Sequence, residues 1–188
     1  MIPACRAMCL VASVALAAAG CSFFESGKAV EPPKPADHFA EGVSFEKQGA
    51  WEQAMAEYRL AVKADPTDSR AWVNLGRIYA RAGDNRSAVG CWRQAVHANP
   101  SDAKAWNQLG GAAMREADYR EAVKLYKKAI DCGPEDPDPY YNAAIASRQL
   151  KNDADAATFY RRWLELSPGV AGDDASEARR FLQARGDE

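Results

Sequence analysis

The stretch WVNLGRIY at residues 72–79 determines how this chain folds. Its large residues and its glycine stand at i, i+3, i+4 and i+7, which places them on one face of an α-helix. Gly83 and Asp84 then break the helical pattern, and a second apolar stretch follows that contains Ala88 and Trp92. Glycine is suited to the left-handed conformation that often ends a helix. The segment therefore predicts two helices joined by a short turn.

The small residues of this segment predict that the two helices are antiparallel and lie close together. Gly76 on the first helix and Ala88 on the second leave room for a close approach, and Trp72 and Trp92 fill the space beside them. Pro100 ends the second helix, because proline lacks the N–H group that a helix interior requires. The unit is a helical hairpin of about 30 residues.

The same pattern recurs every 34 residues. The small residue of the second helix, the aromatic residue after it and the final proline recur at Ala54, Ala88, Ala122 and Ala156, at Tyr58, Trp92, Tyr126 and Tyr160, and at Pro66, Pro100, Pro134 and Pro168. The glycine recurs at Gly42, Gly76 and Gly110 and is replaced by Ala144 in the fourth unit. Such arrays bury their apolar faces only when neighbouring units stack. Four units are predicted, at 35–68, 69–102, 103–136 and 137–170.

The junctions and the end of the array follow the same logic. Asp68, Asp102 and Asp136 precede the next first helices and are predicted N-caps. Residues 171–188 are expected to contain a capping helix and the tail. In the fourth unit Ala143 replaces a large apolar residue while Trp163 replaces an alanine, so we expect Trp163 to fill the space vacated at Ala143.

The period, with its order of small, aromatic and proline positions, resembles the tetratricopeptide repeat. This resemblance implies an all-α fold, namely a right-handed α-solenoid of four helical hairpins plus a C-terminal capping helix. It also implies a concave groove, lined by the first helices, that binds segments of partner proteins. Fold alone does not set the function.

The first residues resemble a bacterial lipoprotein signal peptide, predicted to cover residues 1–20. Arg6 precedes an apolar run at residues 7–19, which is too short to span a bilayer comfortably. The run ends in AAGC at Cys21, which resembles the site where a lipoprotein cysteine is acylated, for instance with palmitate. Ordinary signal cleavage and a retained transmembrane helix remain the alternatives.

Residues 21–34 are predicted to form a lipid-anchored, proline-rich tether ahead of the repeats. Ser22 follows the acceptor cysteine, where an aspartate would resemble an inner-membrane retention signal. We therefore expect attachment to the bacterial cell envelope, at the outer membrane facing the periplasm rather than at the inner membrane.

The composition and the motifs disfavour an enzyme. The chain has 24 basic and 26 acidic residues, a formal net charge of −2, so it has no global attraction to nucleic acid. It has neither a glycine-rich phosphate loop nor a C-x-x-C motif nor a metal-ligand spacing, and we expect no catalytic residue, metal site, cofactor or small-molecule substrate. Cys91 and Cys132 remain after the signal segment. Cys132 takes the place of a buried leucine, and a disulfide between the two stays open.

The resemblance assigns partner-binding positions to the first helices. These positions are Phe39, Val43, Arg70, Val73, Arg77, Lys104, Asn107, Met114, Tyr141, Ile145 and Arg148. They are mainly apolar or basic, so we expect a partner segment with apolar anchors and acidic side chains, unless this face is merely solvated. Val73, Tyr141 and Ile145 are the expected anchors.

The function predicted from these features is a lipid-anchored protein–protein interaction scaffold for envelope complex assembly. The resemblance extends to pilotin-like lipoproteins of type IV pilus biogenesis, which is the first interpretation. Assistance to outer-membrane protein assembly and regulation of peptidoglycan enzymes are alternatives of the same class. An enzyme subunit or redox protein that uses Cys91 and Cys132 is the alternative of a different class.

Overall fold

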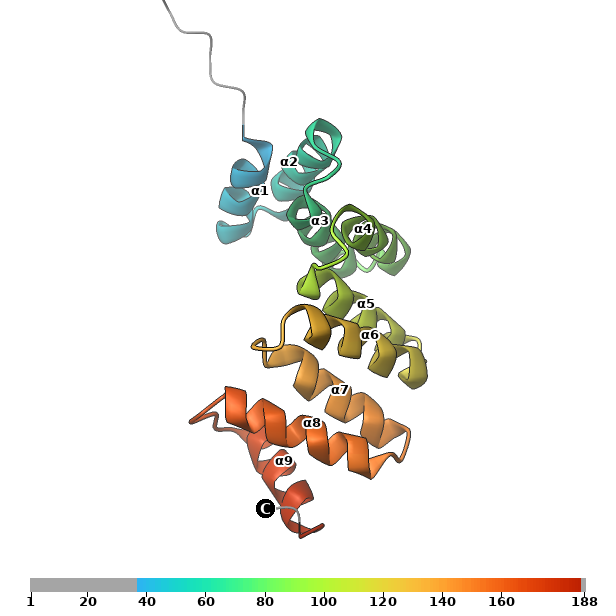
Figure 1. The fold of residues 1–188 in the computed structure, drawn as a ribbon. Coiled ribbons are helices and arrows are strands. Elements are labelled where there is room, and N and C mark those ends of the chain that lie inside the picture. Colours follow the sequence, from blue (N-terminus) through green and yellow to red (C-terminus); the bar gives the residue numbers. More distant parts are fainter. Residues whose placement is uncertain (1–36, 187–188) are drawn as a thin grey trace, which may run out of the picture. The chain divides into compact units, whose positions relative to one another are not determined.

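A computed structural model of the chain describes residues 37–186, and within that range the secondary structure is entirely helical (Figure 1). The helices are α1 (His38–Lys47), α2 (Trp51–Ala64), α3 (Ser69–Arg81), α4 (Asn85–Ala98), α5 (Ala103–Arg115), α6 (Tyr119–Cys132), α7 (Asp138–Gln149), α8 (Asp153–Leu166) and α9 (Asp173–Gln183). They form four hairpins followed by one further helix, which confirms the predicted all-α fold. The predicted signal peptide, Cys21 and the tether lie outside the described residues.

The hairpins stack in chain order (Figure 1). Each helix contacts the next one along the chain, and the first helices of successive hairpins also meet, α3 with α5 and α5 with α7. An ion pair between Arg77 and Glu46 connects α3 to α1. We call the surface made by α1, α3, α5 and α7 the first-helix face.

The close approach of the two helices in a hairpin is confirmed at Gly76. A Cβ atom at this position would lie 2.4 Å from Nε1 of Trp92, a side chain that is only 1% exposed. The Trp92 indole donates a hydrogen bond to the backbone oxygen of Val73 at 3.3 Å, so the ring is fixed in place. Gly42 and Gly110 are equally tight against the tyrosines of their own hairpins.

The turns inside the hairpins repeat a left-handed residue every 34 positions. Gly49, Gly83, Ala117 and Lys151 have φ values of 74°, 82°, 58° and 58°. The conformation is natural for the two glycines and uncommon for the other two residues. The repeat geometry therefore outweighs local preference in the third and fourth hairpins.

Aspartates cap the first helices as predicted, with one exception. Asp68 and Asp102 accept hydrogen bonds from the backbone N–H groups of Arg70 and Ala105. Asp136 instead lies one residue before the N-cap position of α7, which Pro137 occupies. Its carboxylate still accepts the N–H of Asp138, at 3.1 Å.

The expected exchange of volume in the fourth hairpin is wrong. Ala143 is fully buried in a cluster with Val123 and Tyr126, which belong to the third hairpin. Trp163 lies in a different cluster, where its ring centroid is 4.7 Å from that of Tyr141. The two residues have different neighbours, because Ala143 packs against the preceding hairpin and Trp163 does not share that space.

The final helix α9 caps the array by burying its apolar stripe. Ala175, Ala178 and Leu182 are buried against Tyr160 and Trp163 of α8 and their neighbours. Along the part of the chain that the structure describes, no helix has both the length and the apolar character needed to cross a membrane.

Candidate partner-binding site

The first predicted binding residues meet at the start of the first-helix face. The guanidinium of Arg70 lies over the ring of Phe39, 4.6 Å from its centroid, and also pairs with Asp68 at 2.8 Å. Val43 is half-buried against the core of the first hairpin. The half-buried Phe39 and the exposed Arg70 therefore form a small patch of mixed character.

The structure contradicts the exposure expected of Val73. Its side chain is 5% exposed and packs against Ala95 of its own hairpin and Ala105 of the next one. This burial arises from stacking between hairpins, which the analogy of helix positions does not capture. Val73 is a core residue and is not available as a surface anchor.

Arg77 belongs to a closed ring of polar contacts between α1, α2 and α3. Tyr58 donates its hydroxyl to Glu46 at 2.8 Å, Asn74 donates to the Tyr58 oxygen at 3.2 Å, and Arg77 donates to Asn74 and Glu46. Burial, followed by the bond to Glu46, raises the pKa of Tyr58 above its ordinary value. The charge of Arg77 is therefore already balanced within the protein.

The predicted residues of α5 are less constrained by the rest of the chain. Lys104 is exposed at the start of the helix. Asn107 is half-buried and accepts a hydrogen bond from the amide of Asn142 on α7, at 3.2 Å. Met114 is half-buried against the core cluster of the third hairpin.

The predicted residues of α7 contact the chain's own capping helix. Arg148 pairs with Glu177 and lies 5.2 Å from the ring centroid of Phe181, both on α9. Burial, followed by a hydrogen bond to Asp174 of α9, raises the pKa of Tyr141. Ile145 packs against the core cluster that contains Tyr160 and Leu182. Tyr141 and Arg148 therefore both interact with α9, and their role in partner binding stays a prediction.

A cavity of about 320 Å³ lies on the first-helix face, between α1, α3 and α5. It is lined by Glu46, Trp51, Arg77, Ile78, Ala80, Arg81, Trp92, Gln108 and Arg115, and we call it the arginine cleft. The guanidinium of Arg81 stacks on Trp51, 4.0 Å from the ring centroid, and that of Arg115 lies 5.9 Å from the centroid of Trp92. Cation–π stacking holds an arginine in place while its N–H groups at the edge stay able to donate.

Arg81 and Arg115 are not among the predicted binding residues, although the sequence contains a signal for them. Lys47, Arg81 and Arg115 follow one another at the 34-residue step, each in the last turn of a first helix. A cation in the last turn of a helix also complements the helix dipole, so these arginines can be explained without any role in binding. The repeat period together with the aromatic residues beneath would have identified the pair.

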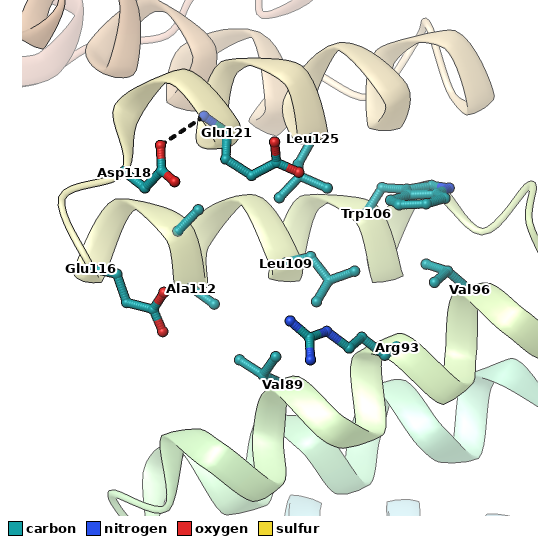
Figure 2. Close-up of a pocket in the computed structure, with 11 residues that line it drawn as sticks. Val89, Arg93, Val96, Trp106, Leu109, Ala112, Glu116, Asp118, Glu121 and Leu125 are labelled. Carbon is teal, nitrogen blue, oxygen red and sulfur yellow. Dashed lines mark hydrogen bonds between the residues drawn. The ribbon is translucent and has the colours of Figure 1, made fainter.

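A second cavity, of about 270 Å³, lies between the second and third hairpins (Figure 2). Figure 2 shows Val89 and Val96 of α4 opposite Trp106 and Leu109 of α5, with Leu125 of α6 nearby. The acids Glu116, Asp118 and Glu121 line one end, where Asp118 caps α6 by accepting the N–H of Glu121. This cleft is the seam along which one hairpin stacks on the next.

The two cysteines among the described residues, Cys91 and Cys132, are not bonded to each other. Both are free; Cys91 is buried and Cys132 is exposed at the end of α6. The core position expected for Cys132 is therefore wrong, because the chain leaves the helix there and the sulfur lies 3.6 Å from the oxygen of Pro100. Burial raises the pKa of Cys91 to about 11, whereas reactive thiols have lowered pKa values.

The family model of the tetratricopeptide repeat matches residues 73–137 and 109–171. The chain belongs to the tetratricopeptide repeat family. Proteins of this family bind other proteins, and the chain is a protein–protein interaction scaffold by its fold. No curated protein matches the sequence significantly.

Three solved structures illustrate how widely this fold is shared. PilF of Pseudomonas aeruginosa is 23% identical with a TM-score of 0.69, over 79% of this chain and 68% of that one. MamA is 20% identical with a TM-score of 0.66, over 80% of this chain and 81% of that one. MamA of Desulfovibrio magneticus RS-1 is 15% identical with a TM-score of 0.66, over 80% and 84%. At these identities the likeness concerns the fold alone.

Proposed function

We propose that this chain is a lipid-anchored scaffold of the bacterial envelope that binds an acidic segment of a partner protein in the arginine cleft. The observation that carries the proposal is the pair Arg81 and Arg115 in one cavity, where Arg81 stacks on Trp51 and Arg115 lies within cation–π distance of Trp92. The planar guanidinium of arginine offers a fork of N–H donors that suits carboxylates.

The charge of the cleft sets the chemistry of the partner. Three arginines line it with one carboxylate, Glu46, which is already paired with Arg77. The cleft thus carries an excess of positive charge within a chain whose formal net charge is −2. Complementary charges raise the association rate and fix the register of a bound segment. We expect a partner that presents two or more carboxylates about one hairpin spacing apart.

A double charge reversal tests this function. Arg81→Glu with Arg115→Glu should abolish capture of the partner by the full-length protein in cross-linked membranes of its native cells, with a photo-reactive group placed at Gln108. The helical circular dichroism should stay unchanged, because both side chains are exposed and contribute little to stability.

The matched control reverses Arg86 and Arg120 instead. These two arginines are also 34 residues apart and exposed, but they lie in the first turns of the second helices α4 and α6. The control has the same net charge as the test variant and should keep the partner. If the control loses the partner and the cleft variant keeps it, binding occurs on another face.

Membrane attachment through Cys21 is the second part of the proposal. The apolar run that ends in AAGC supports it. Metabolic palmitate labelling should mark the wild-type protein, and Cys21→Ala should abolish the label and leave the precursor unprocessed. An unlabelled wild-type protein would contradict the anchor without touching the cleft.

Type IV pilus biogenesis is the first pathway we propose for this scaffold. Its basis is the resemblance to pilotin-like lipoproteins, and the fold shared with PilF is compatible with it. Outer-membrane protein assembly and regulation of peptidoglycan enzymes use scaffolds of the same class. The genes beside this one, and pilus production after its deletion, distinguish the three pathways.

A further inference from the structure

Three positions of each repeat face the hairpin that precedes it. In the third hairpin they are Trp106, Leu109 and Leu125, which Figure 2 shows across the seam from α4. The same positions hold Trp72, Leu75 and Cys91 in the second hairpin and Tyr140, Ala143 and Phe159 in the fourth. All nine residues are apolar or aromatic, as packing between hairpins requires.

In the first hairpin these three positions hold His38, Glu41 and Glu57. His38 and Glu41 lie one turn apart on α1, and Glu57 lies on α2. The Nδ1 atom of His38 is 2.8 Å from an oxygen of Glu57, and the potential ligand atoms of all three residues lie within 4.8 Å of one another. In the other hairpins these helix positions pack apolar side chains against a neighbour. In the first hairpin the same positions bring together one imidazole and two carboxylates.

The residue types are more specific than an exposed end of an array requires. Since α1 begins the array that the structure describes, polar residues are expected on this face, but lysine, arginine, serine or glutamine would serve equally well. Each of the three replacements is instead a residue that binds metal ions. The cluster also gathers two negative charges around a histidine, which favours a divalent cation.

We propose that His38, Glu41 and Glu57 form a site for a divalent transition metal, with Zn²⁺ as the ion that fits best. Imidazole nitrogen and carboxylate oxygen are common zinc ligands at about 2.0–2.2 Å, which places tetrahedral ligand atoms about 3.4 Å apart. The potential ligand atoms lie within 4.8 Å of one another, so metal binding would require the side chains to move slightly closer together. The side chains of His38 and Glu57 are 29% and 19% exposed, so the site is partly enclosed yet open to solvent. Water would complete the coordination.

A bound metal would join α1 to α2 at the end of the array. In the other hairpins this end of the first helix is held by an aromatic hydrogen bond to the preceding turn; for example, Trp72 donates to Pro66 and Trp106 donates to Pro100. His38 occupies the position of these tryptophans and bonds to Glu57 instead. The metal would therefore tighten the hairpin that lacks this support and order the edge of the arginine cleft that α1 provides.

The experiment is a calorimetric titration of the full chain with ZnCl₂ in a chelator-free buffer. We expect one Zn²⁺ per chain and a rise in melting temperature of several degrees once zinc exceeds its Kd about 100-fold. Glu41→Gln should weaken zinc binding at least about 10-fold. It should leave the melting temperature of the metal-free protein nearly unchanged, because the Glu41 side chain is exposed and makes no hydrogen bond or ion pair with the described residues.

The matched control is Glu52→Gln, which removes an exposed glutamate from the first turn of α2 just as Glu41→Gln does from the first turn of α1. It should bind zinc like the wild type. The proposal is overturned if the wild-type chain binds no zinc. It is also overturned if Glu41→Gln binds zinc as tightly as Glu52→Gln, which would place the metal elsewhere, for instance at Cys132.

Discussion

A methyl group added at Gly76 should destabilise the protein, although the same change usually stabilises a helix. Alanine is favoured over glycine in a helix interior by about 0.5–1 kcal/mol. At Gly76, however, the new Cβ would lie 2.4 Å from Nε1 of Trp92, and ordinary contact begins at about 3.4 Å. The indole would have to retreat by about 1 Å, in a place where its ring is 1% exposed.

The magnitude follows from what this retreat costs. Overpacking of a dense core typically costs about 1–3 kcal/mol. The displaced indole would also weaken its hydrogen bond to the Val73 oxygen, a contact worth about 1 kcal/mol. After the gain in helix propensity, Gly76→Ala should lower the free energy of unfolding by about 1–3 kcal/mol. For a domain of this size that corresponds to a fall in melting temperature of about 2–4 °C per kcal/mol.

Gly90 provides the matched control within the same hairpin. It lies inside α4, is exposed, and has no atom within 4 Å of an added Cβ. Gly90→Ala should therefore raise the melting temperature slightly. Both variants are measured by thermal and urea unfolding, with the near-ultraviolet circular dichroism of tryptophan as the probe of the Trp92 environment. If Gly76→Ala is as stable as Gly90→Ala, the close packing at Gly76 does not constrain the hairpin as we infer.

Three further predictions concern the thiols and the capping helix. Among the described cysteines, Cys132 should react with a thiol reagent in the native protein at pH 8, while Cys91 should react only on unfolding, because it is buried with its pKa raised to about 11. The pKa of Cys91 is higher in the folded protein than in the unfolded chain, so the protonated thiol contributes stability that is fully present below about pH 9 and is lost as the pH rises toward 11. In a plot of urea midpoint against pH, Cys91→Ala should therefore reduce the fall in stability over this range. Arg148→Ala removes contacts with Glu177 and Phe181, and it should cost about 1 kcal/mol or less and speed amide hydrogen exchange in α9 more than in α4.

The repeat pattern predicted the hairpins because it records contacts within one unit. The pairing of Gly76 with Trp92, and the left-handed residue at Gly83, are set by residues that lie within 20 positions of each other. The contact at Gly76 recurs at Gly42 and Gly110, and the left-handed glycine recurs at Gly49, so a single sequence displays these local rules more than once. The capping helix could also be predicted from the sequence, because its apolar residues Ala175, Ala178 and Leu182 follow the helical period.

The binding face was harder to predict because its charges are balanced across units. Glu46 neutralises Arg77 and Glu177 neutralises Arg148, over separations of 31 and 29 residues. Glu177 lies outside the first helices, on α9, and Glu46 is a largely buried residue of α1, so a list of exposed first-helix positions taken one at a time does not show these pairings and overestimates the number of available cations. The prediction that Val73 is a surface anchor was wrong for a related reason, since the next hairpin covers its side chain. The position of a residue within a helix predicts the direction in which its side chain points, but the neighbouring helices decide whether that side chain is exposed.

These balanced charges limit where a partner can bind. At one end of the first-helix face, α9 supplies Asp174 and Glu177 to the side chains that would otherwise receive an acidic partner. At the other end Glu46 has the same effect on Arg77. Arg81 and Arg115 lie in the same cleft, and each is held over an aromatic ring. The cleft that we propose for an acidic segment therefore lies away from α9, and a segment that extended onto Tyr141 and Arg148 would have to compete with Asp174 and Glu177 of α9. Removal of α9 should accordingly expose Tyr141 and Arg148 and lengthen the segment that binds, at the cost of the core that Leu182 closes.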